Sequence, residues 1–388
     1  MNLLLATLLL GGLAAGDLTW TTANSVATGD QDNAAVSAVR GGFTAVVWED
    51  DRDAATPADP VHSDVFLRLY QDGVSKYETR LSAGGTGTWR HVQPDVALHE
   101  DGSAVVVWSE DPDGNGFYNI AVRVVRPDGT VAGSATANAS STGQQLDPAV
   151  AADPDGAGFA VVWEDKQSTT APTVRVAGFA SVTSKTYEAQ VHNAGGTHER
   201  PDVAMSAAGN AIVVWDEDGD ANGTFNVGSK ILTPTGGVKL AQGIANASTG
   251  GQQRHASVAA NFNGDYAVAW ETGTQVGVRS FTAPGVAQST TDTLLAGTDP
   301  QVGIGDQLGV VVTTVNASDV YTQGLNPDGT AVGRLPRQAT NQTTVGRQDE
   351  PALGVDAWGQ ITIAYTDDND GNGFDQVYLG TGLSNSTW

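Results

Sequence analysis

The sequence contains no cysteine among its 388 residues, which excludes disulfides, thiolate catalysis, cysteine-ligated zinc and cysteine lipidation. Basic residues are also scarce, because 19 Lys and Arg stand against 44 Asp and Glu, for a formal net charge of −25. Nucleic-acid-binding proteins show the opposite bias, so DNA, RNA and anionic membranes are not expected as partners. Hydrophobic residues make up 40% of the chain, which allows a large core and argues against disorder.

A bilayer-spanning apolar segment is also not found at the N-terminus. The apolar run at residues 3–15 is shorter than the about 20 residues that cross a bilayer. The small residues Ala14-Ala15-Gly16 end it, a pattern typical of a signal peptide and its cleavage site, although no Lys or Arg precedes the run. We therefore predict a signal peptide at residues 1–16, no transmembrane segment in the mature chain, and a secreted or cell-surface protein.

Recognisable catalytic motifs are missing. The six His show no zinc-binding spacing, no G-x-S-x-G elbow is present, and no pair of carboxylates stands out. No catalytic residue is predicted on this basis, and whether the chain is an enzyme stays open, with a non-catalytic protein favoured.

What the sequence does contain is a repeat. An apolar strand ending in Trp recurs five times, and two degenerate copies follow at Val311-Val312-Thr313 and Ile363-Ala364-Tyr365. The five intact copies end at Trp48, Trp108, Trp163, Trp215 and Trp270. Alternating strands, Gly- and Asp-rich turns and the absence of a helical period indicate four antiparallel strands per unit. Units of about 40–55 residues with four strands are typical of propeller blades, whereas immunoglobulin-like sandwiches need about 100 residues each.

The sequence therefore predicts an all-β fold, a seven-bladed β-propeller in a single domain at residues 17–388. The expected blades are residues 32–90, 91–146, 147–199, 200–254, 255–299, 300–350, and 351–388 together with 17–31. The last unit has only three strands, and the segment before the first unit matches a fourth strand. We expect the N-terminal strand to complete the last blade, which removes the open sheet edges. The Trp rings are expected to pack between blades.

Three acidic loops follow the Trp strands in the same register, with the pattern Asp-x-Asp-x-Asn-Gly and an amide three residues after the Gly. Calcium prefers six to eight oxygen ligands, and alternate Asp and Asn side chains in a tight loop supply them. A solvated Asp/Asn-rich turn is the alternative for each single loop. The predicted Ca²⁺ ligands are Asp111, Asp113, Asn115 and Asn119; Asp218, Asp220, Asn222 and Asn226; and Asp368, Asp370, Asn372 and Gln376.

With these motifs the chain resembles secreted prokaryotic propeller repeats with a Gly-Phe-Val-Val-x-Trp strand and Asp-Gly-rich loops, found in large calcium-dependent surface proteins. The loops are also similar to the FG-GAP calcium loops of integrin α-subunit propellers, with Asn in place of the third Asp. The resemblance covers residues 17–388 for the repeat and three blades for the loops. It implies extracellular binding or adhesion and supplies no substrate.

One polar residue precedes each expected inner strand and differs from blade to blade. These residues would surround the mouth of the central channel, where a varied set on a repeated frame favours ligand binding, although an ordinary polar loop ring is the alternative. The candidate ligand-binding residues are Asn33, Gln93, Asp147, Arg200, His255, Asp299 and Glu350.

Three functions stay open from the sequence. The favoured one is a secreted or cell-surface calcium-binding propeller that acts as a non-catalytic binding or adhesion module for an extracellular glycan or protein. The second is a structural subunit of an extracellular assembly, such as a surface layer, sheath or filament. The third is a carbohydrate-active hydrolase or lyase, which predicts carboxylates or a His–Arg pair converging at the channel mouth. The sequence leaves the oligomeric state undetermined.

Overall fold

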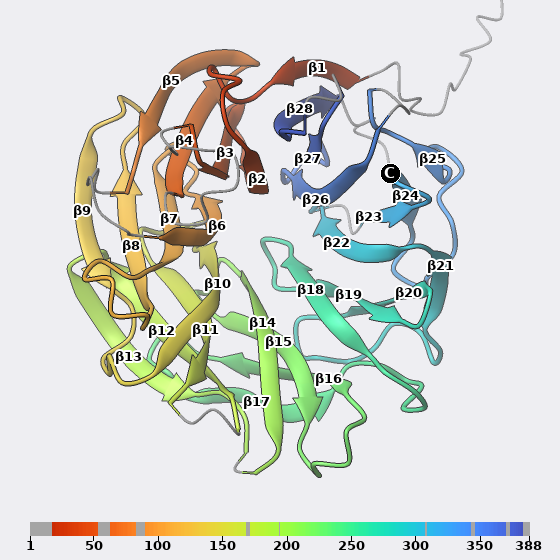
Figure 1. Ribbon diagram of the computed structural model, residues 1–388. Helices are drawn as coiled ribbons and strands as arrows, with labels where there is room; N and C mark the ends of the chain where they lie inside the picture. The colour runs from red at the N-terminus through yellow and green to blue at the C-terminus, as the bar shows by residue number, and fades with distance from the viewer. Residues whose placement is uncertain are drawn as a thin grey trace, which may run out of the picture.

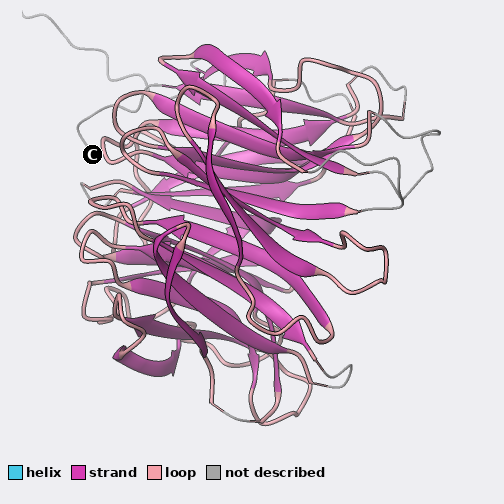
Figure 2. Cartoon of the chain, turned by 90° about the vertical axis from the view of Figure 1, so that its left-hand side faces the viewer, coloured by secondary structure: helices cyan, strands magenta, loops and turns pink. Residues whose placement is uncertain are grey.

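The computed structural model describes residues 18–52, 63–82, 90–167, 171–193, 195–306, 309–342, 346–369 and 373–382. These residues form strands, turns and loops, and no helix is found among them (Figure 2). The strands build seven four-stranded sheets arranged in a ring (Figure 1). The protein is a seven-bladed β-propeller, as the repeats predict. Within the described ranges no helix is long and apolar enough to cross a membrane.

Each of the first four blades is an antiparallel sheet of four consecutive strands. The first blade comprises β2 (Gln31–Ala38), β3 (Phe43–Asp50), β4 (Asp64–Gln71) and β5 (Val74–Arg80). The second comprises β6 (His91–Leu98), β7 (Ala104–Glu110), β8 (Asn119–Val125) and β9 (Val131–Thr136). The third comprises β10 (Gln144–Ala152), β11 (Phe159–Lys166), β12 (Thr173–Ser181) and β13 (Ser184–Gln190). The fourth comprises β14 (Thr197–Met205), β15 (Ala211–Asp218), β16 (Asn226–Leu232) and β17 (Val238–Ile244).

The remaining three blades include the one that closes the ring. The fifth comprises β18 (Arg254–Ala260), β19 (Tyr266–Thr272), β20 (Gln275–Phe281) and β21 (Thr293–Ala296). The sixth comprises β22 (Thr298–Ile304), β23 (Val310–Asn316), β24 (Asp319–Leu325) and β25 (Gln338–Ala339). The seventh comprises β26 (Gln348–Val355), β27 (Ile361–Asp367), β28 (Gln376–Gly382) and, as its outer strand, β1 (Leu18–Thr22).

The two ends of the chain meet in the seventh blade. Strand β1 pairs antiparallel with β28, in a register that runs from Leu18 opposite Gly382 to Thr22 opposite Tyr378. Figure 1 shows this red strand beside the blue strands of the C-terminal blade. The predicted closure by the N-terminal strand is therefore confirmed. The predicted signal peptide at residues 1–16 lies outside the described residues.

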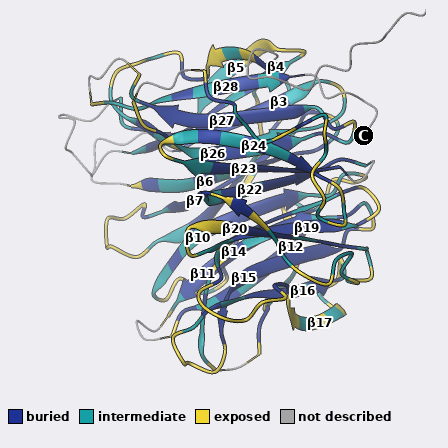
Figure 3. Cartoon of the chain, turned by 90° about the vertical axis from the view of Figure 1, so that its right-hand side faces the viewer, coloured by how far each residue is buried: buried dark blue, intermediate teal, exposed yellow. Residues whose placement is uncertain are grey.

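The core lies between blades. Trp108 of the second blade is 1% exposed and shares a cluster with Leu67 and Leu69 of the first. Trp163 packs in the same way against the second blade, and Trp215 against the third. The second strands are buried over most of their length, whereas outer strands such as β17 are largely exposed (Figure 3). Packing of the Trp rings between blades is confirmed, and it explains the continuous apolar runs that precede them.

In the sixth blade, the position equivalent to the Trp is shifted by one residue from the predicted one. Gln301 of its inner strand pairs with Thr313, as Ala35 pairs with Val47 in the first blade. Thr314, and not Thr313, therefore occupies the position of Trp48. The valine run at residues 310–312 contains no large ring, so the sequence pattern does not mark the register there.

Candidate functional site

A β-bulge re-aims one side chain near the start of every inner strand. In the first blade the ladder jumps from Asp32 opposite Glu49 to Ala35 opposite Val47, and the same shift recurs in the other six. The first residue of each bulge has a positive φ, which non-glycine residues seldom adopt. These residues and their φ values are Asn33 (49°), Gln93 (58°), Asp147 (48°), Arg200 (47°), His255 (53°), Asp299 (51°) and Glu350 (50°).

These seven bulge residues are the ones that the sequence places at the channel mouth. All of them line one pocket of about 440 Å³, hereafter the mouth pocket. Pro follows the bulge residue in five blades, and Ala follows it in the other two. Because Pro donates no ladder hydrogen bond, it is compatible with a bulge and not with a regular central strand. The structure therefore brings the seven candidate residues together.

A set of acidic residues that sequence reasoning missed holds four of the bulges in place. Each acidic residue directly follows a Trp of a second strand and accepts the backbone N–H of the next blade's bulge residue. The pairs are Glu49 Oε1 with Gln93 N (2.7 Å), Glu164 Oε2 with Arg200 N (3.4 Å), Asp216 Oδ1 with His255 N (2.9 Å) and Glu271 Oε1 with Asp299 N (2.8 Å). The sequence feature that could have identified these residues is a Trp followed directly by Asp or Glu, which recurs in four of the seven units.

Basic groups of the mouth gather in the fourth and fifth blades. The Arg200 guanidinium reaches Asp216 Oδ2 at 3.3 Å and Glu199 Oε2 at 3.4 Å, both through Nη1. Arg254 contacts the same two carboxylates, at 3.1 and 2.5 Å, and its guanidinium lies over Phe225. Glu199 and Asp216 are thus held between two guanidinium groups.

His255 lies beside this group and is partly exposed. Its Nδ1 is 2.8 Å from Glu271 Oε2, and this hydrogen bond raises the pKa of the imidazole. The same bond lowers the pKa of Glu271. Glu271 therefore contacts the His255 ring through one oxygen and the backbone of Asp299 through the other.

Carboxylates from the sixth and seventh blades face the pocket beside His255. Burial, with the negative charges of Glu271 and Glu350, raises the pKa of Asp299 to about 6. The Asp299 carboxyl makes no hydrogen bond or ion pair to another described residue. Glu350 Oε2 accepts Asn33 N at 2.8 Å and the Thr366 hydroxyl at 3.3 Å. Burial raises the pKa of Glu350, and the hydrogen bond from Asn33 N opposes the rise.

The first blade contains a further pair of carboxyl groups with raised pKa values. Asp32 and Glu49 stand opposite each other in the ladder of the first blade. Burial is the main cause that raises the pKa of Asp32 to about 8 and that of Glu49 to about 7. Glu49 does not line the mouth pocket, and its oxygens accept hydrogen bonds from Gln93 N and the Asn33 amide. Glu49 therefore positions the mouth residues.

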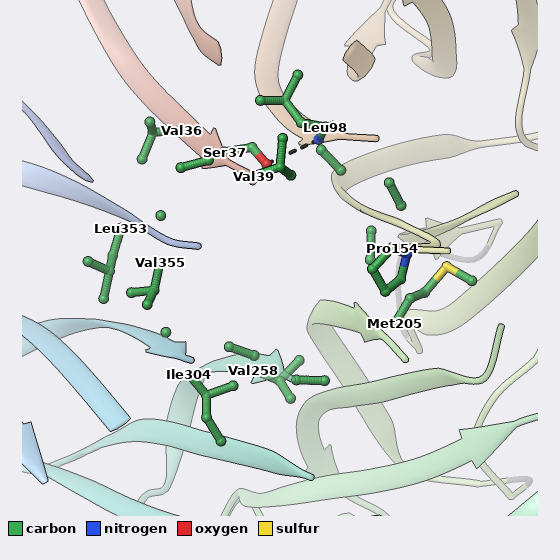
Figure 4. Close-up of a pocket in the computed structure, with 18 of the residues that line it drawn as sticks. Val36, Ser37, Val39, Leu98, Pro154, Met205, Val258, Ile304, Leu353 and Val355 are labelled. Atoms are coloured by element: carbon green, nitrogen blue, oxygen red, sulfur yellow. Dashed lines mark hydrogen bonds between the residues drawn. The ribbon is translucent and has the colours of Figure 1, made fainter. Parts of the chain in front are cut away.

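The channel continues below the mouth along the inner strands. A second cavity of about 290 Å³ shares Ala35, Asp95, Asp202, Ser257, Gln301 and Ala352 with the mouth pocket, and these residues form the channel waist. Further along, its lining is mainly apolar and includes Val36, Leu98, Met205, Val258 and Ile304 (Figure 4). Polar groups are therefore found at the mouth and the waist, and again at the far end of this cavity, where Arg40 pairs with Asp306.

Two carboxyl groups at the waist join neighbouring inner strands. Asp95 Oδ2 accepts Val150 N at 2.7 Å, and Asp202 Oδ2 accepts Val258 N at 2.7 Å. Burial raises the pKa of Asp95 to about 7 and that of Asp202 to about 6. A carboxyl group whose pKa is higher in the folded than in the unfolded chain stabilises the fold at low pH, and this contribution is lost as pH rises through the folded pKa.

Asp95→Asn is therefore expected to raise the melting temperature at pH 8 and to change it little near pH 4. The amide oxygen of Asn still accepts the Val150 N–H, while the cost of ionising a buried carboxyl disappears. Thermal melts from pH 4 to 8, with the exposed Asp101→Asn as control, measure the difference. A variant that is less stable than wild type at pH 8 contradicts the raised pKa.

The predicted calcium loops of the second and fourth blades have the same geometry. Asp111 accepts Asn115 N at 3.1 Å and Gly116 N at 2.8 Å, one through each carboxylate oxygen. Asp218 accepts Asn222 N and Gly223 N, both at 3.0 Å. Each oxygen keeps a lone pair. Within the described ranges, however, no group of three or more His, Cys, Asp or Glu is placed to hold a metal ion.

The later amides do not join these loops. Asn119 Oδ1 accepts the Asn138 amide at 2.8 Å, and Asn226 Oδ1 accepts the Asn246 amide at 2.9 Å. In the seventh blade, Gln376 Oε1 accepts the Asn24 amide at 2.6 Å. These amides connect the third strand to the end of the outer strand. The predicted ligands Asp370 and Asn372 lie outside the described residues.

Comparison with known proteins relates the chain to other propellers. No protein-family model matches it, and no curated protein matches it either. An α-L-arabinanase of Penicillium chrysogenum is 12% identical, with a TM-score of 0.54, over 94% of this chain and 98% of that one. The GH93 α-L-arabinofuranosidase of Fusarium graminearum is 13% identical, with a TM-score of 0.52, over 94% and 97%. The polysaccharide lyase Uly1 is 11% identical, with a TM-score of 0.53, over 91% and 89%.

These comparisons correct the function that the sequence favoured. The prediction of a non-catalytic binding or adhesion module, with a structural subunit as its alternative, is wrong, because propellers that cleave carbohydrates match over nine tenths of the chain. The mouth pocket also contains the converging carboxylates and the His–Arg pair expected only of the third function. The sequence placed these residues at the mouth but did not indicate which of them contact one another, because neighbouring mouth residues are separated by a whole blade.

Proposed function

We propose that this propeller is a carbohydrate-active enzyme that hydrolyses glycosidic bonds at the mouth pocket. The observation that carries the proposal is a pair of carboxyl groups, Asp299 and Glu350, that line the pocket from adjacent blades in different environments. Glycoside hydrolysis needs two carboxyl groups, one protonated and one ionised. The likeness to an arabinanase, an arabinofuranosidase and a polysaccharide lyase supports the choice of carbohydrate as substrate.

Asp299 is the general acid in this proposal. Its pKa of about 6 keeps it protonated in mildly acidic solution, and its oxygens are free to meet a substrate. The Glu271 contact to its backbone N–H fixes the bulge that aims the side chain at the pocket. A carboxyl group held in this way can donate its proton to the glycosidic oxygen as the bond to the anomeric carbon breaks.

Glu350 is the ionised partner. Hydrogen bonds from Asn33 N and the Thr366 hydroxyl stabilise its carboxylate form and leave Oε1 for the reaction. As a base, it takes a proton from the water that attacks the anomeric carbon. As a nucleophile, it bonds to that carbon and is released by water in a second step. In either case, one water molecule is added across the glycosidic bond.

The test is an assay of reducing ends released from a panel of neutral and acidic extracellular polysaccharides at pH 5 to 6. Release of reducing ends by the wild-type protein, and its loss in Asp299→Asn and in Glu350→Gln, supports the proposal. A panel without any turnover, or turnover unchanged in both variants, contradicts it. An extracellular glycan as substrate agrees with the predicted secretion, which remains a prediction.

We also propose that the loops of the second and fourth blades bind calcium. The support is their shared geometry, in which Asp111 and Asp113, like Asp218 and Asp220, turn carboxylate oxygens toward one loop centre. Hard oxygen ligands of this kind suit Ca²⁺. In this proposal the ion stabilises two turns beside the mouth and takes no part in the reaction.

Chelation is expected to lower the melting temperature by several degrees, because a ligand that binds only the folded chain stabilises it. Thermal melts with and without a chelator, followed by readdition of Ca²⁺, measure this effect. The double variant Asp113→Asn with Asp220→Asn should melt lower and lose its response to the chelator. An unchanged melting curve of the wild-type protein on chelation counts against calcium binding.

A further inference from the structure

We infer that the Arg200–His255 sector of the mouth pocket binds a carboxylate of the substrate, so that the substrate class is an acidic glycan containing uronic acid residues. This inference rests on the proposed function, because it assigns the substrate of the same pocket. It starts from the unequal distribution of charge around the mouth. Of the seven bulge residues, only Arg200 and His255 are basic, and they come from adjacent blades.

Arg200 presents an unused edge to the pocket. Its two contacts to carboxylates both involve Nη1, so Nε and Nη2 have no partner among the described residues. The side chain is 43% exposed, which leaves this edge open to a ligand. Nε and Nη2 form a planar pair of donors that matches the two oxygens of a carboxylate.

His255 adds a third donor beside this edge. Its Nδ1 is engaged by Glu271 at 2.8 Å, and its Nε2 has no partner in the described part of the chain. The imidazole side chain is 46% exposed. The bond to Glu271 favours the protonated ring, in which Nε2 also donates a hydrogen bond.

The surrounding ion pairs hold the sector in this orientation. Arg254 contacts Glu199 and Asp216 through Nη2 and Nε, so the two carboxylates are shared between two guanidinium groups and Arg200 contacts them through Nη1 alone. The Arg254 guanidinium is itself fixed over the Phe225 ring, 3.9 Å from its centroid. The fold therefore positions Arg200 and leaves two of its donor nitrogens, Nε and Nη2, without a partner among the described residues. Two free guanidinium donors at a pocket suit an anionic ligand with two oxygens.

The position of the sector relative to the carboxyl pair sets the orientation of the sugar. Glu271 contacts the His255 ring through Oε2 and Asp299 N through Oε1, so the anion sector adjoins the general acid. A uronate whose carboxylate contacts Arg200 and His255 would place its glycosidic bond toward Asp299. A neutral sugar offers these three donors only hydroxyl oxygens, which accept weaker hydrogen bonds than a carboxylate.

The test measures binding and not turnover, so that it does not depend on the proposed reaction. The protein carries Asp299→Asn to prevent cleavage, and the ligands are polygalacturonate, alginate and glucuronan, each paired with its carboxyl-reduced form. Isothermal titration at about 0.15 M ionic strength screens out non-specific attraction. A sulfated neutral galactan is included to separate carboxylate recognition from the binding of any polyanion.

We expect at least one polyuronate to bind, and its carboxyl-reduced form to bind about tenfold or more weakly. Arg200→Gln should cause a similar loss, Arg200→Lys a smaller one, and the exposed Arg126→Gln none. Equal binding of the neutral form, equal binding of the sulfated galactan, unchanged affinity in Arg200→Gln, or no binding to any polyuronate would overturn the inference. Hydrolysis of a neutral glycan that Arg200→Gln does not affect would overturn it while leaving the proposed function in place.

Discussion

Asp299→Asn should lower kcat by a factor of about 10² to 10⁴, the range typical of losing a general acid. The substitution keeps the shape of the side chain and removes the proton that the leaving oxygen needs. Because the Asp299 carboxyl makes no hydrogen bond or ion pair to another described residue, the variant should fold, and near pH 5, where the wild-type carboxyl is protonated, it should melt like the wild type. The effect is therefore expected in kcat and not in stability.

The pH profile provides a second measurement of the same prediction. A general acid with a pKa of about 6 is lost as pH rises above that value, so wild-type activity should fall on the alkaline side of pH 6. Asp299→Asn should lose most of the activity, and the residual activity should no longer fall above pH 6. The control is Asp328→Asn on an exposed turn, which should change neither rate nor profile. Wild-type activity that rises steadily to pH 8 would exclude Asp299 as the acid.

Deleting residues 18–28 should cost about 5 kcal/mol or more of stability, which is comparable to the whole stability of many domains. The deletion removes β1, and with it Leu18, which is 7% exposed, and the ladder to β28. It also removes Asn24, whose amide donates to Gln31 of the first blade and Gln376 of the seventh. The seventh blade would then end in an unpaired edge, and the ring would no longer be closed through its own chain.

A point variant tests the same closure in a protein that still folds. Trp20 packs edge-on against Tyr365, with ring centroids 5.3 Å apart, and covers Gly380. Trp20→Ala should cost about 3 kcal/mol, the lower part of the range for losing such a ring, because the side chain is only partly buried. Urea unfolding measures the loss, and Thr19→Ala, an exposed position on the same strand, is the control. Equal stability of the two variants would show that packing of β1 contributes little to the stability of the ring.

Much of the fold could be predicted from the sequence because each blade repeats the same local pattern. The Val-Val-Trp strands, the turns between them and the missing fourth strand of the last unit are all visible along the chain. The pattern failed only in the sixth blade, where threonine replaces the aromatic ring. The candidate mouth residues could also be placed, since each one occupies the same position in its repeat.

The chemistry of the mouth could not be predicted, because its partners come from different blades. The Glu271 side chain joins His255 of its own blade to the backbone of Asp299 in the next. Nothing in the local sequence shows that the residue after a Trp contacts the bulge of the following blade. Asn119 shows the same limit, since the loop pattern does not indicate that its side chain oxygen accepts the amide of Asn138.

The amino-acid sequence by itself therefore determined the seven blades, the closure by the N-terminal strand and the identity of the mouth residues. These features follow from short-range periodicity, because every blade buries the same faces against its neighbours. Only the tertiary structure decided that Asp299 and Glu350 lie side by side in the ring and that Arg200 presents an unused edge. Ring closure and the seven bulges bring together side chains about one blade apart in sequence, and their mutual burial and charge then set which are protonated.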